Sequence, residues 1–512
     1  VSLSKDIYRQ NNYAERLELG ELGGDRYVAI LNGQASLPVG SSIVVLPLKA
    51  DSEADLQKLR KLDGGNIELV DNTKRALEAA GLTTGLRINP ATVGTSIGST
   101  LLWAKLDSDD DHELIIGNPA ADGGNGEVWV IRGSYLKQVA EGGSKVLDLE
   151  ESSNVRRLVL PADKADPDRA GFGTSLAVGP LTSSTTQTLV IGAPGQITDA
   201  ASGSRQGAVW TWTLQGADWA SSTNLPNELD TGANYVEKGG RLLQARSNNE
   251  PSVEPTDLQF GSSLAFAQLE VGKPAVLLVG MPGLQSTYTL NSGGHAEITP
   301  DQRDFYLQAV RKTVRDSEPP QQETLTVESG GVLAIDQGNN RQLLIVGQTF
   351  GGDPARAGEA LASGGSFDSD DKQDVAIGLP EEDNGTGAVA LVRGSTLLNL
   401  LEQAGTDLAN KAQTATRNLA PNISLYIHGQ KPGERLGTVL RLDGNVVNSS
   451  EIDKNELVIG NPAADERTGE VYVITGQSME GLADSPSNET IGGISFHNLT
   501  VQDPAGRLTL TP

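Results

Sequence analysis

The sequence predicts an all-β protein built from repeated four-stranded units, because three features recur along its 512 residues. Each unit has a short glycine-containing start, then an apolar run that ends in Gly-x-Pro, and then a Gly-x-Val run of alternating apolar residues. Gly-x-Pro follows an apolar run at Gly117, Gly192, Gly280, Gly378 and Gly460. Short β-rich runs bounded by Gly, Pro and Asp are typical of strands. Four such runs per unit, at intervals of ~60–90 residues, indicate the radial plan of a β-propeller.

The two clearest copies of the unit lie at 117–133 and 460–476. The first copy reads Gly-Asn-Pro-Ala-Ala-Asp and then Gly-Glu-Val-Trp-Val-Ile-Arg-Gly. The second has the same pattern, with Tyr in place of Trp and Thr in place of Arg. A third copy runs from Gly378 to Gly394. Similarity at this level, repeated along the chain, indicates a repeat architecture.

We predict one β-propeller domain over residues 1–512, with seven blades, one of them shared by the two termini. Val1–Leu3 would supply a fourth strand, and a terminal strand in 503–512 would begin the seventh blade. Joining terminal strands in one blade would remove exposed sheet edges. The two middle strands of that blade are not visible in the sequence, so a six-bladed ring is the alternative. The six complete repeats are placed at about 14–89, 90–160, 168–244, 257–347, 354–428 and 433–499.

Insertions between the strands are the second organisational feature. Leu56, Leu59 and Leu62 lie at helical spacing and predict a helical segment at 51–85. Helical segments are also predicted at 134–142 and 395–415. The largest insertion, 284–328, combines a polar part with a helix-like run at 304–312. Such an insertion is either a solvated decoration or an arm that faces a partner, because loops on a rigid scaffold commonly carry binding.

Composition excludes several classes of function. The formal net charge is −26, which disfavours nucleic acid as a partner, because binding to phosphate needs a basic surface. No apolar run reaches the ~18–20 residues of a membrane helix, so we expect no direct membrane insertion. The absence of cysteine excludes disulfides, a thiolate zinc site and a cysteine nucleophile. Together with the low aromatic content, it favours a bacterial protein, because secreted animal proteins of this length usually carry disulfides, whereas many exported bacterial proteins carry none.

Two repeats carry dense carboxylates directly before the apolar Gly-x-Pro run. Calcium takes oxygen ligands from carboxylates and carbonyls of a tight loop, and so many acids in one turn repel one another without a cation. The alternative is a solvated turn in which Asp side chains accept hydrogen bonds from backbone amides. The candidate ligands are Asp107, Asp109, Asp111 and Glu113 in one loop, and Asp368, Asp370, Asp371 and Asp374 in the other.

With these motifs in place, the whole chain resembles the FG-GAP repeat family. This family includes the β-propellers of integrin α chains and of glycosylphosphatidylinositol-specific phospholipase D. Phe172-Gly173 and Gly192-Ala193-Pro194 reproduce both halves of the family name within one repeat. The resemblance implies one to three calcium ions in loops of the type Asp-φ-Asp/Asn-x-Asp-Gly-x-x-Asp.

On the family pattern, three residues of each loop fall on the third, fifth and ninth positions. These are Asp107, Asp109 and Glu113 in one loop, and Asp368, Asp370 and Asp374 in the other. In the last repeat, Asp443, Asn445 and Glu456 match only if the residues near Val446–Glu451 are an insertion. The sequence departs from the pattern at the first position, which holds Lys105, Ser366 or Arg441, and at the glycine position, which holds Asp110 or Asp371. A lysine at the first position could replace the cation by pairing with the acids.

The resemblance implies an extracellular or cell-surface propeller that serves adhesion or the binding of a protein or glycan ligand on one face. We expect no enzyme activity, and the sequence shows no His-Glu-x-x-His, no convincing nucleophile elbow and no phosphate-binding loop. A glycosidase is the enzymatic alternative, because glycosidase propellers use acids at the central mouth and need none of these motifs. One alternative is a non-catalytic accessory propeller of a larger secreted hydrolase such as a phospholipase D-like enzyme. Another is a purely structural module of a large surface protein.

Overall fold

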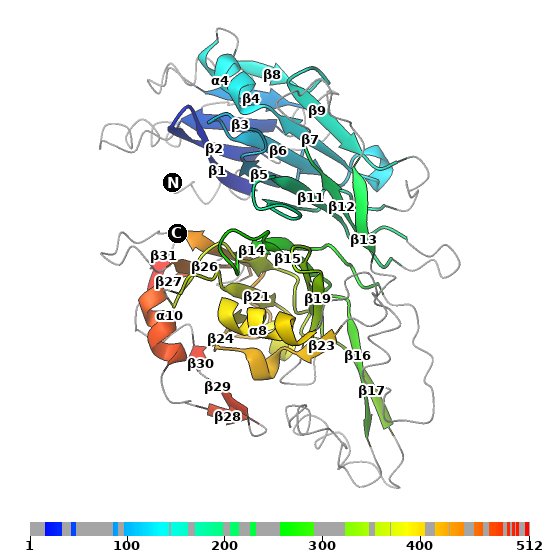
Figure 1. Ribbon diagram of the computed structural model, residues 1–512, viewed down its shortest axis with the longest axis vertical. Helices are drawn as coiled ribbons and strands as arrows, with labels where there is room; N and C mark the ends of the chain where they lie inside the picture. Colours follow the sequence, from blue (N-terminus) through cyan, green and yellow to red (C-terminus); the bar gives the residue numbers. More distant parts are fainter. Residues whose placement is uncertain are drawn as a thin grey trace. The chain divides into compact units, whose positions relative to one another are not determined.

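The protein is all-β, and its strands form eight sheets in the described part of the chain (Figure 1). The structure is a computed structural model. It describes residues 16–32, 42–47, 85–90, 97–142, 145–161, 169–197, 205–214, 226–231, 257–290, 323–347, 354–368, 370–404, 415–429, 431–444, 455–463, 470–484, 489–491, 494–496, 498–500 and 507–510. The chain divides into two compact units. Unit 1 is Val1–Val178, Gln187–Gln196 and Trp210–Glu228, and unit 2 is Gly179–Thr186, Ile197–Val209 and Leu229–Pro512.

Six of the sheets have the order of a propeller blade, with sequential strands as neighbours. Blade 1 holds β1 (Arg16–Leu22), β2 (Asp25–Asn32), β3 (Ser42–Pro47) and β4 (Leu86–Asn89). Blade 2 holds β5 (Thr100–Ala104), β6 (Glu113–Asn118), β7 (Glu127–Ile131) and β9 (Val155–Val159). Blade 3 holds β10 (Ser175–Gly179), β11 (Thr188–Ala193), β12 (Ala208–Trp212) and β13 (Asn227–Thr231).

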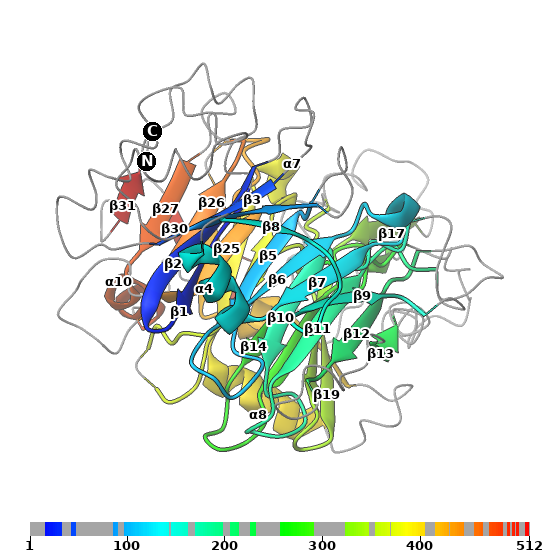
Figure 2. The same ribbon diagram turned by 90° about the horizontal axis from the view of Figure 1, so that it is seen from above.

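The remaining blades have the same plan. Blade 4 holds β14 (Leu264–Ala267), β15 (Val276–Gly280), β18 (Gly331–Asp336) and β19 (Arg341–Val346). Blade 5 holds β20 (Leu361–Ala362), β21 (Val375–Leu379), β22 (Ala388–Val392) and β24 (Leu425–His428). Blade 6 holds β25 (Val439–Gly444), β26 (Glu456–Asn461), β27 (Glu470–Ile474) and β31 (Arg507–Leu510), which lie side by side in Figure 2.

The structure therefore contains six blades, and the prediction of seven was wrong. The terminal strand does not begin a seventh blade, because β31 pairs antiparallel with β27 as the fourth strand of blade 6, with Val471 opposite Leu510. Residues 498–500, which the sequence places at the end of the sixth repeat, form β30 and pair with β24 of blade 5. The edge of β27 is thus left for β31 to cover. Val1–Leu3, the expected partner strand, lies outside the described residues.

Three blades carry a fifth strand that comes from the next repeat. β8 (Val146–Asp148) pairs parallel with β4, β23 (Ala415–Asn418) with β19, and β30 (Asn498–Thr500) with β24. In the sequence, each fifth strand comes between the third and fourth strands of its own repeat. In space, it pairs with the edge strand of the preceding blade. Such cover removes a row of unpaired backbone groups, so consecutive repeats are joined by backbone pairing.

A helix precedes each of these fifth strands. The helices are α4 (Gly133–Glu141), α8 (Gly394–Ala404) and α10 (Gly476–Ala483). The predictions of helix at 134–142 and 395–415 are confirmed for α4 and for 395–404, whereas Ala415 begins a strand. None of the helices in the described part of the chain is long and apolar enough to cross a membrane.

Two two-stranded sheets stand apart from the blades. The ends of the insertion 284–328 form the antiparallel pair β16 (Gln285–Leu290) and β17 (Glu323–Glu328), which leads away from β19 in Figure 1. We call this pair the β16–β17 arm. The second pair is β28 (Glu489–Ile491) with β29 (Ile494–Phe496). The helical segment predicted at 304–312 lies outside the described residues, as does all of the segment predicted at 51–85 except Gly85.

The hydrophobic core lies between the faces of consecutive blades. In unit 1, Tyr27 and Ile43 of blade 1 pack in one cluster with Leu114 and Trp129 of blade 2. In unit 2, one cluster joins blades 4 and 5, and a second joins blades 5 and 6. The second strand of most blades is buried on both faces, which explains why it reads as a continuous apolar run.

The repeated glycines mark close backbone contacts within and between blades. Within blade 5, the Gly358 amide donates to the Gly378 carbonyl at 3.1 Å. A Cβ on Gly378 would lie 2.2 Å from the carbonyl oxygen of Gly437 in blade 6. Gly117 and Gly280 meet the next blade in the same way, with 2.2 and 2.1 Å to the oxygens of Gly173 and Gly358. In these three repeats, the glycine of Gly-x-Pro is therefore required by the distance between blades.

This contact gives a first prediction. Gly378→Ala should lower the free energy of unfolding by about 1–3 kcal/mol, because the added methyl group must push two backbones apart. Gly481→Ala is the control, because a Cβ at Gly481 in α10 meets nothing within 4 Å. There, alanine should stabilise the helix by up to about 1 kcal/mol. Chemical denaturation of both variants checks the pair, and equal effects would contradict the close-contact explanation.

Candidate functional site

The loop between β5 and β6 gathers three carboxylates. Asp107, Asp109 and Glu113 each place an oxygen within 4.8 Å of the others. The loop is shaped by its own side chains, because the Asp109 amide donates to Asp107 Oδ1 at 2.9 Å and the Asp111 amide to Asp109 Oδ1 at 3.0 Å. Hydrogen bonds of this kind form successive Asx turns.

The loop between β20 and β21 is built in the same way. Asp368, Asp370 and Asp374 place oxygens within 4.8 Å of one another. The Asp370 amide donates to Asp368 Oδ1 at 3.4 Å, and the Lys372 amide donates to Asp370 Oδ1 at 2.8 Å. The structure therefore brings together the third, fifth and ninth positions predicted for both loops. We call these two sets the blade 2 loop and the blade 5 loop.

The last carboxylate of each loop is fully buried and accepts hydrogen bonds from both the loop and the start of a helix. Glu113 accepts from the Leu106 amide at 2.6 Å and from the Gly133 amide, at the start of α4, at 3.4 Å. Asp374 accepts from the Phe367 amide at 2.7 Å and from the Gly394 amide, at the start of α8, at 2.8 Å. Each carboxylate thus satisfies an amide in the first turn of a helix, where donors otherwise lack partners.

Both buried carboxyls have strongly raised pKa values. Burial is the largest cause and raises the pKa of Glu113 to about 7, with a further contribution from the charges of Asp107 and Asp109. Burial likewise raises the pKa of Asp374 to about 7, and the negative charges of Asp368 and Asp370 also raise it. The amide hydrogen bonds act in the opposite direction but do not compensate. A nearby cation would favour the ionised form of each carboxyl.

One arginine forms ion pairs with the acids of each loop, and the sequence motifs did not identify it as a site residue. Arg132 Nε lies 3.5 Å from Asp107 Oδ2, and its Nη2 lies 3.5 Å from Asp109 Oδ2. Arg393 Nε lies 3.1 Å from Asp368 Oδ2, and Arg393 also pairs with Asp484 after α10. Both arginines directly follow the third strand of their blade. The sequence carries a signal for them, because Arg-Gly-Ser follows this strand only in the two acidic repeats, while the sixth repeat has Thr475 there.

The other predicted residues of these loops lie outside the convergent sets. Asp111 accepts a hydrogen bond from the Gly23 amide of blade 1, and Asp371 is exposed. Lys105 pairs at 3.3 Å with the exposed Asp110. The cation that contacts the convergent acids is therefore an arginine rather than the lysine expected at the first position.

The last repeat is only partly described. Glu456 is buried at the start of β26, as Glu113 is at the start of β6. Asn445 and the side chain of Asp443 lie outside the described residues. The third predicted site stays a prediction.

The end of each acidic loop is hydrogen-bonded to the preceding blade. The His112 amide donates to the Glu21 carbonyl of blade 1 at 2.8 Å, and the Gln373 amide donates to the Gln268 carbonyl of blade 4 at 2.9 Å. These residues directly precede Glu113 and Asp374. A rigid loop would therefore fix the edge of its own blade against the neighbouring one.

The donor sets fit calcium in type and in charge. Calcium takes about six to eight oxygens, which three carboxylates, loop carbonyls and water can supply. Three ionised carboxylates and one arginine leave two negative charges, which one divalent cation would neutralise. Among the described residues, these two loops are the only groups of three or more His, Asp or Glu side chains with convergent ligand atoms. His112 lies outside them, and burial lowers its pKa.

Comparisons of the sequence with models of known protein families and with curated proteins gave no match.

Proposed function

We propose that the protein is a calcium-braced β-propeller that acts by binding, as an adhesion or ligand-binding module outside the cell or on its surface. The blades supply a rigid scaffold, and the connections between strands supply the contacts to a protein or glycan partner, as loops on rigid scaffolds commonly do. Calcium in the two acidic loops would hold each loop against the preceding blade. Extracellular calcium modules bind at about 10⁻⁴–10⁻³ M, a range suited to loops with few carboxylates.

The observation that carries this proposal is the equivalence of the two loops. Each gathers three carboxylates, closes on a buried carboxyl of raised pKa and ends in a backbone hydrogen bond to the preceding blade. A catalytic set would be expected once in the chain. A repeated set at repeat-equivalent positions supports a structural ion.

Thermal unfolding in excess EDTA, and then in millimolar calcium with magnesium as control, tests the proposal. An ion that binds the folded chain alone stabilises it by RT ln(1 + [L]/Kd), which is about 1.4 kcal/mol for each site at 10 Kd. We expect a calcium-specific rise of the melting temperature, and Asp370→Asn should reduce it. Asp371→Asn is the matched control, because it removes the same charge from an exposed acid of the same loop. An absent rise, or an equal reduction in both variants, would refute the calcium proposal.

A further inference from the structure

Three blades of unit 2 begin with a long polar side chain in a left-handed backbone conformation. These residues are Gln259, Arg356 and Arg435, with φ values of 56°, 52° and 59°. Each lies two positions before the first glycine of its blade. In blade 3 this place is taken by Gly171, with φ 67°. Glycine adopts this conformation without strain, whereas other residues do so at a cost of about 1–2 kcal/mol. Contacts of the longer side chains must offset that cost.

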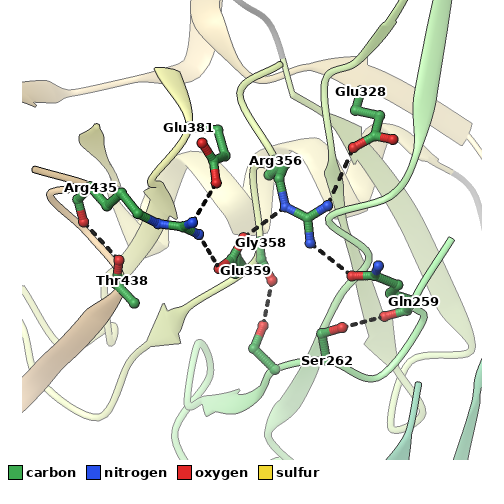
Figure 3. A network of polar contacts seen from close by, with 10 residues as sticks. Gln259, Ser262, Glu328, Arg356, Gly358, Glu359, Glu381, Arg435 and Thr438 are labelled. Carbon is green, nitrogen blue, oxygen red and sulfur yellow. Dashed lines mark hydrogen bonds and ion pairs between the residues drawn. The ribbon is translucent and has the colours of Figure 1, made fainter. Parts of the chain in front are cut away.

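Arg356 uses all three guanidinium nitrogens and reaches back to blade 4 (Figure 3). Its Nη2 donates to Gln259 Oε1 at 2.8 Å, and its Nη1 donates to Glu328 Oε2 at 3.3 Å. Its Nε donates to Glu359 Oε2, within blade 5, at 2.8 Å. Hydrogen bonds between a guanidinium and carboxylates are charge-assisted and stronger than neutral ones.

Arg435 repeats this arrangement one blade further along. Its Nη1 lies 2.7 Å from Glu381 Oε1, and its Nη2 lies 3.1 Å from Glu359 Oε1. Both acids belong to blade 5. Glu359 therefore binds one arginine with each of its oxygens, and the two arginines are joined through a single carboxylate (Figure 3).

Glu359 stands where three other repeats have a hydroxyl that caps the turn. Three positions after the left-handed residue, Thr174, Ser262 and Thr438 each donate a hydroxyl to that residue's carbonyl at 2.6–2.7 Å. In blade 5 the same position holds Glu359, whose amide donates to the Arg356 carbonyl as the amides of those residues do, but whose side chain makes no such bond. The side chain is thereby free to connect the neighbouring blades.

The network also reaches the base of the β16–β17 arm. Glu328 is the last residue of β17, and its carbonyl accepts from the Ala355 amide at 2.9 Å. The side chains of the network are between about a fifth and two fifths exposed, so water screens them only in part. Burial lowers the pKa of Arg356, but its bonds to Glu359 and Glu328 outweigh this, and the pKa is raised.

We propose that Gln259, Glu328, Arg356, Glu359, Glu381 and Arg435 form an interblade clamp that holds the starts of blades 4, 5 and 6 in register and anchors the base of the β16–β17 arm. In blade 5 the clamp lies at the start of the first strand, and the acidic loop follows the end of that strand. The clamp contains no residue of the acidic loops. It therefore stands independently of calcium binding.

Arg356→Asn tests the clamp, because asparagine accepts the left-handed conformation better than arginine but is too short to reach the three partners. Arg169→Asn is the matched control. Arg169 is also left-handed, with φ 82°, is exposed, and makes no ion pair with any described residue. In EDTA, we expect Arg356→Asn to lower the melting temperature by about 2–4 °C and the control to leave it unchanged or raise it. A fall no larger than that of the control would overturn the proposal.

A double variant tests whether the clamp is continuous. Arg356 and Arg435 share Glu359, so the shift for Arg356→Asn with Arg435→Asn should differ from the sum of the single shifts. Strict additivity would overturn the continuity of the clamp. Hydrogen exchange gives a second readout, because losing Arg356 should speed exchange at the Gly330 and Ala355 amides beside the arm. Unchanged exchange there would overturn the anchoring of the arm.

Discussion

The calcium-free protein should lose stability as the pH rises from about 4 to about 7. Glu113 and Asp374 have pKa values of about 7 in the folded chain, against ordinary values of 4.5 and 3.8. Between these limits the folded chain binds more protons than the unfolded chain, so the free energy of unfolding falls with increasing pH. One pKa unit corresponds to about 1.36 kcal/mol. Each carboxyl should therefore contribute a loss of about 3–4 kcal/mol across this window.

Denaturation in EDTA at a series of pH values measures this loss. Glu113→Gln and Asp374→Asn should each flatten the profile, because an amide cannot ionise at this position. Glu434→Gln is a matched control in the same structure, since Glu434 is nearly buried but lies in neither acidic loop. Millimolar calcium should also flatten the wild-type profile by favouring the ionised carboxylates. A profile that rises toward pH 7 in EDTA would contradict the raised pKa values.

The blades could be predicted from the sequence because their requirements are local. Gly378 has no side chain because a neighbouring backbone passes 2.2 Å from where its Cβ would lie, and the same contact occurs at Gly117 and Gly280. The acidic loops could be predicted for a similar reason. Their convergent acids lie within seven consecutive residues, so the turn alone brings Asp107, Asp109 and Glu113 together.

The blade count and the arginines depend on contacts that are distant in the sequence. Both 498–500 and 507–510 are short strands after β27, and only pairing decides that the first joins blade 5 and the second completes blade 6. Asp503-Pro-Ala-Gly resembles the Asp353-Pro-Ala-Arg that precedes blade 5, so the local sequence favours 507–510 as the start of a blade rather than as its last strand. Arg132 and Arg393 likewise follow a third strand, far along the chain from the acids that they contact.

Replacing Arg393 should separate the effect of its guanidinium on the blade 5 loop from the effect of the calcium ion proposed there. Arg393→Gln removes the guanidinium 3.1 Å from Asp368, whose side chain is only 12% exposed. Without calcium, the unpaired acids should lower the free energy of unfolding by about 2 kcal/mol, less than for a fully buried pair because the arginine is partly solvated. With the competing positive charge removed, calcium should bind about tenfold more tightly, a gain of about 1.4 kcal/mol.

Calorimetric titration of calcium, together with unfolding in EDTA, measures both effects of Arg393→Gln. Lys372→Gln makes the same change of charge within the loop, but the Lys372 side chain has no ion pair with the convergent acids in the described structure. Its effects on stability and on calcium affinity should therefore be smaller. Arg393→Lys should recover part of the stability without calcium, because it restores the charge but not the geometry of the guanidinium. If Arg393→Gln and Lys372→Gln bind calcium equally well, the arginine does not compete for the loop, and the ion and the guanidinium occupy separate positions around the same carboxylates.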